Sequence, residues 1–251
     1  MASDNVLFEG DTQFGHYKVV DTIYDGRKAR VLYSGDYQAA QSGVAQDSQS
    51  DLLFDYNQRL IEIISAVEPA HVLLIGGGAF TLPKALAEDY PDMQIDVIEL
   101  DAGLLPIAKN YFDFVPSKQV RVHTGDGRKY IDTTTQTYDL IIVDAFHNSM
   151  TPRSLQTADA VKGFAHRLKP GGIVAVNAIA SYYGLRSAAL RRHVANLQTQ
   201  FKTVDIFPAS YGQSLWLPQN FVLIAHAGNR DFVPYVRFAP VAPYQATDER
   251  T

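Results

Sequence analysis

The sequence predicts an α/β fold with a mostly parallel, seven-stranded sheet and a small N-terminal β-hairpin region. Two observations carry this prediction. From residue 71 onward, short runs of continuous apolar residues alternate with helical segments, as expected of strands that are buried on both faces of a parallel sheet. Before that point, two β-rich runs flank Asp25-Gly26, a dipeptide typical of hairpin turns.

The composition limits the classes of protein to which this chain can belong. With 251 residues, 46% of them apolar and 20% charged, the chain is expected to form one soluble α/β domain with an appendage. A net charge of −5 argues against a broad phosphate-binding surface, so we expect no nucleic acid partner. The absence of cysteine excludes disulfides, thiolate zinc sites and cysteine nucleophiles, and it favours a reducing cytoplasm.

Two further absences support a cytoplasmic localisation. The stretch Met1–Gly10 is acidic and poor in apolar residues, unlike a signal peptide. No apolar run approaches the roughly 18 residues that a membrane span needs. We therefore expect no membrane attachment.

The first third of the chain is predicted to hold one hairpin and one helix. Strands Tyr17–Tyr24 and Lys28–Ser34 form the hairpin. The stretch Tyr37–Ser50 is rich in Gln, Ser, Ala and Gly, and it is predicted to be a loop. A helix should follow, because apolar residues from Leu52 to Val67, with Tyr56 among them, recur at spacings of three and four.

The remaining elements follow the alternation of strands and helices. The seven strands are expected at Val72–Ile75, Ile95–Leu100, Val120–Thr124, Leu140–Val143, Ile173–Ala178, Thr203–Phe207 and Phe221–Ala225. Helices fill the gaps, the last of them at roughly Leu185–Phe201. The stretch Gly228–Thr251 carries three prolines and no periodicity, so we expect a tail there.

A glycine turn follows the first of these strands. Gly76, Gly77 and Gly78 stand between the strand and a helix that should begin near Thr81. Glycines allow the backbone to approach a nucleotide closely, and a helix N-terminus offers free N–H groups. The same three glycines are also compatible with a tight turn that binds no ligand.

An acidic residue ends the second strand about 20 residues after the glycines. At this distance in a Rossmann-like fold, a carboxylate reaches the hydroxyls of a bound ribose. Glu99 is the candidate, because one carboxylate can accept hydrogen bonds from both hydroxyls. Asp101 is predicted instead to cap the next helix.

The turn after the third strand separates two classes of nucleotide site. An NAD site would require a third glycine where Thr81 stands. The run Gly125-Asp126-Gly127, followed by Tyr138–Asp144 and by Gly171-Gly172, is instead typical of class I S-adenosylmethionine-dependent transferases. Asp126 would then accept a hydrogen bond from the adenine amino group.

These motifs give a set of candidate residues and a domain division. The cofactor-binding candidates are Gly76, Gly77, Gly78, Glu99, Asp126 and Gly127. We divide the chain into a small β region (1–50), a Rossmann-like nucleotide-binding domain (51–228) and a C-terminal tail (229–251). His71, His123 and His166 are interpreted as structural, and no His, Asp or Glu cluster has the spacing of a metal site, so we expect no metal.

The motifs taken together resemble the spermidine synthase (polyamine aminopropyltransferase) family, which has the class I methyltransferase fold. The resemblance covers roughly residues 14–226 and includes the N-terminal hairpin, which the family carries as a small domain. It implies that S-adenosylmethionine or its decarboxylated form is the co-substrate. It also implies a small-molecule acceptor and a homodimer.

The chain departs from the family in the loop after the fourth strand. The family has an Asp-Ser-Ser-Asp-Pro type loop and then a Pro-Ala-Glu-Ser-Leu type segment. Here Asp144 is kept, His147 stands for the second acid and Arg153 for the glutamate, and Ala79 replaces an aspartate after the glycines. The loss of acids makes the site less suited to a cationic polyamine. Asp144 and His147 are the catalytic candidates: Asp144 as a general base or as a carboxylate that faces the sulfonium, and His147 as the base for a neutral or anionic acceptor.

Several functions remain open at this stage. The leading hypothesis is a spermidine synthase-like transferase that moves an aminopropyl group. The alternatives are an S-adenosylmethionine-dependent methyltransferase for a non-polyamine acceptor and a nucleoside-binding module without catalysis. An NAD-dependent oxidoreductase is less favoured than any of these.

Overall fold

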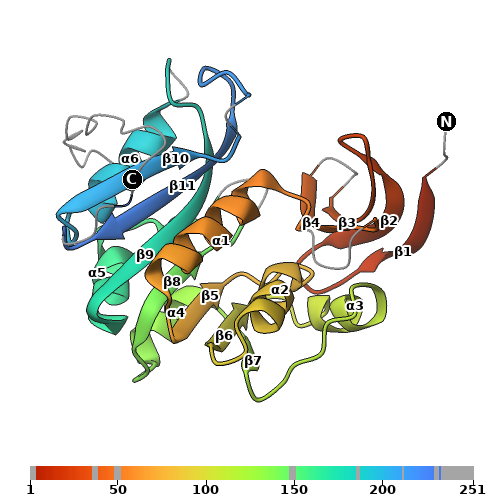
Figure 1. Ribbon diagram of the computed structural model, residues 1–251, viewed down its shortest axis with the longest axis horizontal. Coiled ribbons are helices and arrows are strands. Elements are labelled where there is room, and N and C mark those ends of the chain that lie inside the picture. The colour runs from red at the N-terminus through yellow and green to blue at the C-terminus, as the bar shows by residue number, and fades with distance from the viewer. Residues whose placement is uncertain are drawn as a thin grey trace.

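The computed structural model describes residues 4–35, 39–47, 52–146, 151–184, 187–210, 212–228 and 232. They form two sheets, and the smaller one is N-terminal and antiparallel (Figure 1). Its strands, in spatial order, are β1 (Asn5–Asp11), β2 (His16–Tyr24), β3 (Arg27–Ser34) and β4 (Ala39–Ala45). The tail and His147 lie outside the described residues, apart from Phe232 in the tail.

The larger sheet has the order β10-β11-β9-β8-β5-β6-β7. Its strands are β5 (His71–Ile75), β6 (Gln94–Glu99), β7 (Val120–Thr124), β8 (Tyr138–Val143), β9 (Leu168–Ala180), β10 (Thr203–Pro208) and β11 (Gln219–His226). Strand β11 pairs antiparallel with β9 and β10, and the other pairs in the sheet are parallel. The predicted seven-stranded, mostly parallel sheet is confirmed.

Helices cover both faces of this sheet. They are α1 (Asp55–Val67), α2 (Thr81–Asp89), α3 (Leu104–Tyr111), α4 (Gly127–Thr133), α5 (Ala158–Arg167) and α6 (Ala188–Leu197), with a 3₁₀ helix η1 (Arg153–Leu155). One hydrophobic core lies between the sheet and α1–α3, and the other lies between the sheet and α4–α6. In the described part of the chain, no helix is long and apolar enough to cross a membrane.

The N-terminal sheet is larger than the sequence predicts. The predicted hairpin is correct, and both Asp25 and Gly26 have positive φ angles, of 49° and 80°. The prediction of a loop over Tyr37–Ser50 is wrong for residues 39–45, which form β4 and pair with β3. Ala, Gln, Ser and Gly have low strand propensity, so this strand depends on its partner's open edge rather than on its own residues.

The ends of two helices also differ from the prediction. Leu52 does not begin a helix but forms an isolated bridge with Val44, and α1 begins at Asp55. The last helix covers Ala188–Leu197 rather than Leu185–Phe201. Residues 185 and 186 lie outside the described residues. The apolar face that predicted this helix is correct, because Leu190, Val194 and Leu197 are all buried.

The chain reverses direction across the sheet between β5 and β8. From β5 it proceeds to β6 and β7 on one side, and it then returns to β8 and β9 on the other. In such sheets the strand ends diverge at the reversal and leave a crevice at their carboxyl edge. This crevice is where the predicted site residues lie.

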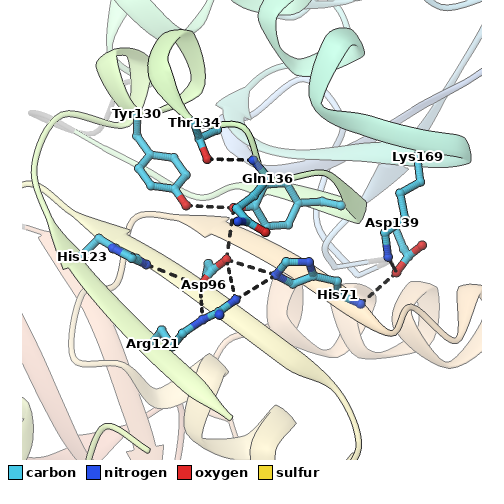
Figure 2. A network of polar contacts seen from close by, with 10 residues as sticks. His71, Asp96, Arg121, His123, Tyr130, Thr134, Gln136, Asp139 and Lys169 are labelled. Carbon is cyan, nitrogen blue, oxygen red and sulfur yellow. Dashed lines mark hydrogen bonds and ion pairs between the residues drawn. The ribbon is translucent and has the colours of Figure 1, made fainter. Parts of the chain in front are cut away.

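A buried carboxylate fastens the edge strand β7 to the sheet, as Figure 2 shows. Asp96 of β6 is 1% exposed, and its oxygens bind Arg121 Nε at 2.7 Å and His71 Nε2 at 3.0 Å. The Tyr138 hydroxyl donates to it at 3.1 Å, and His123 Nε2 lies 3.4 Å from it. Two of the histidines that the sequence assigns a structural role therefore lie in this network.

The Asp96 network predicts a pH-dependent contribution to stability. Burial opposes ionisation, but the bonds from His71 and Arg121 outweigh it and hold the pKa of Asp96 well below its usual range. The carboxylate therefore stabilises the fold above the pKa of about 3.9 that aspartate has in unfolded chains, and this contribution is lost as the pH falls through the folded-state value.

We therefore expect Asp96→Asn to lower the free energy of unfolding by about 1.5–3 kcal/mol at neutral pH, as for hydrogen bonds to charged groups. The difference from the unmodified protein should shrink below about pH 4. Urea titrations at several pH values measure it. Asp132→Asn, which breaks a surface pair with Arg128, is the matched control and should change stability by less than about 0.5 kcal/mol. A loss from Asp96→Asn that is equal at all pH values would contradict this account.

Candidate active site

Backbone hydrogen bonds join the strand ends at the crevice. Asp144 N donates to Ile75 O at 2.9 Å, and Gly76 N donates to Ile98 O at 2.9 Å. Gly125 N donates to Glu99 O at 2.8 Å. The residues that follow β8, β5, β6 and β7 are thus held in one row along the edge of the sheet.

Glycine is required in this turn both by close contacts with neighbouring residues and by the backbone angles. Gly76 has a φ of +102°, and a Cβ there would collide with the carbonyl group of Asp144. Gly78 has a φ of +54°, and a Cβ there would meet the hydroxyl of Ser42 from β4. Helix α2 begins at Thr81, as predicted. The turn is therefore pressed between β8 on one side and the N-terminal sheet on the other.

The carboxylate of Glu99 binds the glycine turn directly. Its Oε2 accepts from Gly77 N at 2.7 Å and from Gly78 N at 3.2 Å, and its Oε1 accepts from Asp101 N at 2.8 Å. Burial raises the pKa of Glu99, and the three backbone N–H groups oppose that rise. A carboxylate has about four lone-pair positions. Three of them are used by backbone N–H groups, and the predicted bonds of Glu99 to a ribose stay a prediction.

Asp126 lies at the start of α4. It follows β7, the neighbour of the strand β6 that carries Glu99. Its Oδ1 accepts from Lys129 N at 2.8 Å and caps the helix. Its other oxygen makes no hydrogen bond within the described residues. Gly127 is the first residue of α4, and a Cβ there would collide with Ile75 of β5. The helix can therefore approach the sheet closely and bring Asp126 to the crevice.

Asp144 follows β8 and is partly buried. Asn177 Nδ2, from β9, donates to its Oδ1 at 2.8 Å. Burial raises the pKa of Asp144 to about 7, although hydrogen bonds from Asn177 and from the Tyr56 hydroxyl oppose the rise. A carboxyl group with this pKa can accept a proton near neutral pH. The other catalytic candidate, His147, lies outside the described residues.

One cavity of about 490 Å³ contains these groups, a size usual for small-molecule sites. All the described candidates line it: Gly76, Gly77, Gly78, Glu99, Asp126, Gly127 and Asp144. The crevice at the direction reversal thus brings together residues that are up to 68 positions apart in the sequence. Within the described residues, no group of three or more His, Asp or Glu side chains could hold a metal ion.

The N-terminal sheet supplies cavity residues that sequence reasoning missed. Phe14 and Tyr17 come from the β1–β2 region, and Gln41 and Ser42 come from β4. Ser42 Oγ accepts from Ala79 N at 3.0 Å. The chain around Ser42 resembles a loop in composition, so its sequence carries no sign of this role.

Arg153 lies on the α4 side of the cavity. It begins η1, and the next residue is tied to α4, because Arg128 Nη1 donates to Ser154 O at 3.4 Å. The first turn of α4 is next to Asp126. The backbone of η1, which carries Arg153, therefore lies beside α4 at one side of this cavity.

A second cavity, of about 510 Å³, lies on the β9 side of Asp144. It is lined by Tyr24, Asp25, Leu53, Phe54, Asp55, Tyr56, Ile179, Ala209, Ser210, Gln213, Pro218, Gln219 and Asn220. This described lining includes two carboxylates and no Lys, Arg or His. Gln219 is 6% exposed, and its Oε1 is buried without a hydrogen-bond partner among the described residues. The second cavity therefore suits a ligand that donates hydrogen bonds or carries positive charge.

Asn177 and Tyr56 link the two cavities, and both escape the sequence analysis. Tyr56 fits the apolar face of α1 and was counted with it, although its hydroxyl bonds Asp144. Asn177 is a fully buried polar residue within the otherwise apolar second half of β9, which begins at Ile173. A lone amide in such a strand is the one signal that could have identified it.

Comparison with known proteins is consistent with this geometry. Residues 57–210 match the family model of the spermine/spermidine synthase domain. A polyamine aminopropyltransferase of Vibrio vulnificus (strain CMCP6) is 30% identical over 191 residues, which are 74% of this chain and 62% of that protein. The chain thus spans less than two thirds of the length of this relative.

Two solved structures share the fold. A probable spermidine synthase from Corynebacterium glutamicum ATCC 13032 has a TM-score of 0.75 and 20% identity, covering 87% of this chain and 79% of that one. Human methyltransferase-like protein 13, solved in complex with SAH, has a TM-score of 0.60 and 21% identity, covering 74% of this chain and 86% of that one. At these identities the likeness shows the fold alone.

The Glu99 geometry predicts a specific effect on nucleoside binding. In Glu99→Gln, the amide oxygen can accept bonds only on one side, and the NH₂ group faces a backbone N–H. We expect the glycine turn to shift and the affinity for methylthioadenosine to fall at least about tenfold, equivalent to 1.4 kcal/mol. Calorimetry measures this. Glu88→Gln, on an exposed position of α2, is the matched control and should bind normally. Unchanged affinity in Glu99→Gln would remove Glu99 from the site.

Proposed function

We propose an activity from one premise: the chain belongs to the spermine/spermidine synthase family. The activity is transfer of an aminopropyl group from decarboxylated S-adenosylmethionine to an amine acceptor. The observation that carries the proposal is the position of Asp144, which lines the first cavity and is bonded by Tyr56 of the second. A base at this junction can serve a reaction between a nucleoside-bound group and an acceptor.

The first cavity has the features that an adenosine moiety requires. In the proposal, the glycine turn gives close access to the backbone, Glu99 accepts from the ribose, and Asp126 accepts from the adenine amino group. The donor's sulfonium end then lies toward Gly76 and Asp144, because the row along the sheet edge runs in the order β7, β6, β5, β8.

The reaction is a displacement at the carbon attached to sulfur. The neutral amine of the acceptor forms a bond to this carbon, the carbon–sulfur bond breaks, and its electron pair leaves with the neutral thioether. The new secondary ammonium gives a proton to Asp144. Orientation of the two reactants supplies most of the acceleration, and a base in this position adds about 10²–10⁴-fold. His147 remains an alternative base.

The second cavity supports an amine acceptor despite the replaced acids of the loop. Its described lining offers the carboxylates of Asp25 and Asp55, which accept hydrogen bonds from ammonium groups. Arg153, which stands where the family has a glutamate, lines the first cavity and is not part of the described lining of the second cavity. The described lining of the second cavity therefore has negative charge and no positive charge.

Asp144→Asn tests the base directly. We expect transfer to fall by about 10²–10⁴-fold, with binding of methylthioadenosine retained, because the amide keeps the volume and cannot take the proton. In the unmodified protein the rate should rise with pH through about 7, where Asp144 becomes ionised. The matched control is Asp126→Asn, which should weaken nucleoside binding and leave the pH profile in place. Normal turnover by Asp144→Asn would exclude the role.

The choice of donor separates aminopropyl from methyl transfer. Calorimetry with decarboxylated S-adenosylmethionine, S-adenosylmethionine, methylthioadenosine and NAD should give the tightest binding for the decarboxylated donor or the thioether. Preference for intact S-adenosylmethionine would favour the methyltransferase alternative. Binding without transfer to any amine would favour the non-catalytic module.

The assembly and location of the protein remain proposals as well. We propose a homodimer, as the resemblance to the family implies, and sedimentation of the purified chain measures it. A reducing cytoplasm suits a chain without cysteine. The division into parts at residues 50 and 228 is likewise proposed rather than established.

A further inference from the structure

Three side chains form a hydrogen-bonded row between the two cavities: Asn220 of β11, Asn177 of β9 and Asp144, which follows β8. Asn220 Nδ2, on β11, donates to Asn177 Oδ1 at 2.9 Å. Asn177 Nδ2, on β9, donates to Asp144 Oδ1 at 2.8 Å. Asn177 is 0% exposed, so neither end of its amide can exchange its partner for water.

The direction of the Asn177 amide matters because its two ends are chemically opposite. The NH₂ group donates and the oxygen accepts. If this amide were reversed, its oxygen would face the Asp144 carboxylate and its NH₂ group would face that of Asn220. Both contacts are repulsive when buried. While Asn220 donates, Asn177 can therefore offer Asp144 only an N–H.

We propose that Asn177 and Asn220 are positioning residues for Asp144. Asn220 fixes the direction of the Asn177 amide, and Asn177 then holds one oxygen of Asp144 with an N–H. This inference rests on the proposed function in that Asp144 is the base of the transfer. The inference goes beyond the proposed function because Asn220, which lines the second cavity, then influences the ionisation of Asp144.

The surroundings of Asp144 leave the Asn177 amide with a large influence on whether the Asp144 carboxyl group is ionised. From α1, the Tyr56 hydroxyl also bonds Asp144. The other charged groups of the described cavity lining are Glu99, Asp101, Asp126, Arg128 and Arg153. They belong to β6, α4, η1 and the adjoining turns, whereas Asn177 bonds Asp144 directly. Loss of the N–H removes a contact that favours the ionised carboxylate, so the protonated form should persist to higher pH.

The experiment reads the ionisation of Asp144 without requiring turnover. Protein labelled with ¹³C at aspartate carboxyl carbons is titrated by NMR, and the Asp144 signal is assigned by its absence in Asp144→Asn. We expect Asn177→Ala to move the midpoint upward by about one pH unit, a tenfold change in the ionisation equilibrium. Asn220→Ala should move it in the same direction by less.

The double variant distinguishes a relay, in which Asn220 acts on Asp144 through Asn177, from two independent effects on the ionisation of Asp144. Since Asn220 acts through Asn177, Asn177→Ala/Asn220→Ala should titrate like Asn177→Ala alone. Gln213→Ala, which changes the lining of the second cavity without touching the row, should leave the midpoint in place. The acid limb of kcat/KM should move with the NMR midpoint in each variant, while a purely structural loss would lower the rate equally at every pH.

Two results would overturn the proposal. One is an unchanged Asp144 midpoint in folded Asn177→Ala, with folding verified by its thermal transition. The other is a double variant whose shift equals the sum of the two single shifts. Absence of transfer by the unmodified protein would reject the proposed function instead, and the NMR titrations would still decide whether the relay exists.

Discussion

The close contact between Gly76 and the backbone of Asp144 is the constraint on which the site depends. A side chain at Gly76 would separate the two strand ends at the point where the chain reverses across the sheet. Because the position has no side chain, the turn proposed to bind the nucleoside and the proposed base lie next to each other. The other residues of the row along the sheet edge lie on either side of this contact.

Three carboxylates differ in pKa because their partners differ: Asp96 and Glu99 are buried in the sheet, and Asp144 is partly buried just after β8. Asp96 has cationic and hydroxyl donors and stays ionised, so it holds an edge strand. Glu99 has three backbone donors, and its pKa rises because burial dominates. Asp144 has one amide and one hydroxyl, too few to offset burial, so its pKa is about 7. The number and charge of the donors thus separate a structural acid from a proposed proton acceptor.

The N-terminal sheet is part of the site rather than an appendage to it. Ser42 contacts the glycine turn, and Asp25 of the β2–β3 turn lines the second cavity. Figure 1 shows this sheet beside α2 and α3. A cavity between two sheets can hold two reactants on different sides of one base, which a single strand edge cannot do.

The sequence by itself determined the fold and named residues that line one cavity, which we propose to bind a nucleoside. Buried parallel strands carry apolar runs, and a glycine turn followed by an acid about 20 residues later reflects the backbone geometry of one local unit. These signals lie within short stretches of chain, so Gly76–Gly78, Glu99, Asp126 and Asp144 could be named before their positions were known.

Only the tertiary structure decided how these groups are partnered. Strand β4 has no sequence signature because its pairing is supplied by β3, and Tyr56 follows the apolar pattern of α1 although its hydroxyl meets Asp144. Asn177 and Asn220 are 43 residues apart and become neighbours only because β11 pairs with β9. Hydrogen bonds between distant strands depend on which strands become neighbours, and the order of the strands is set by the fold as a whole rather than by any one short stretch of sequence.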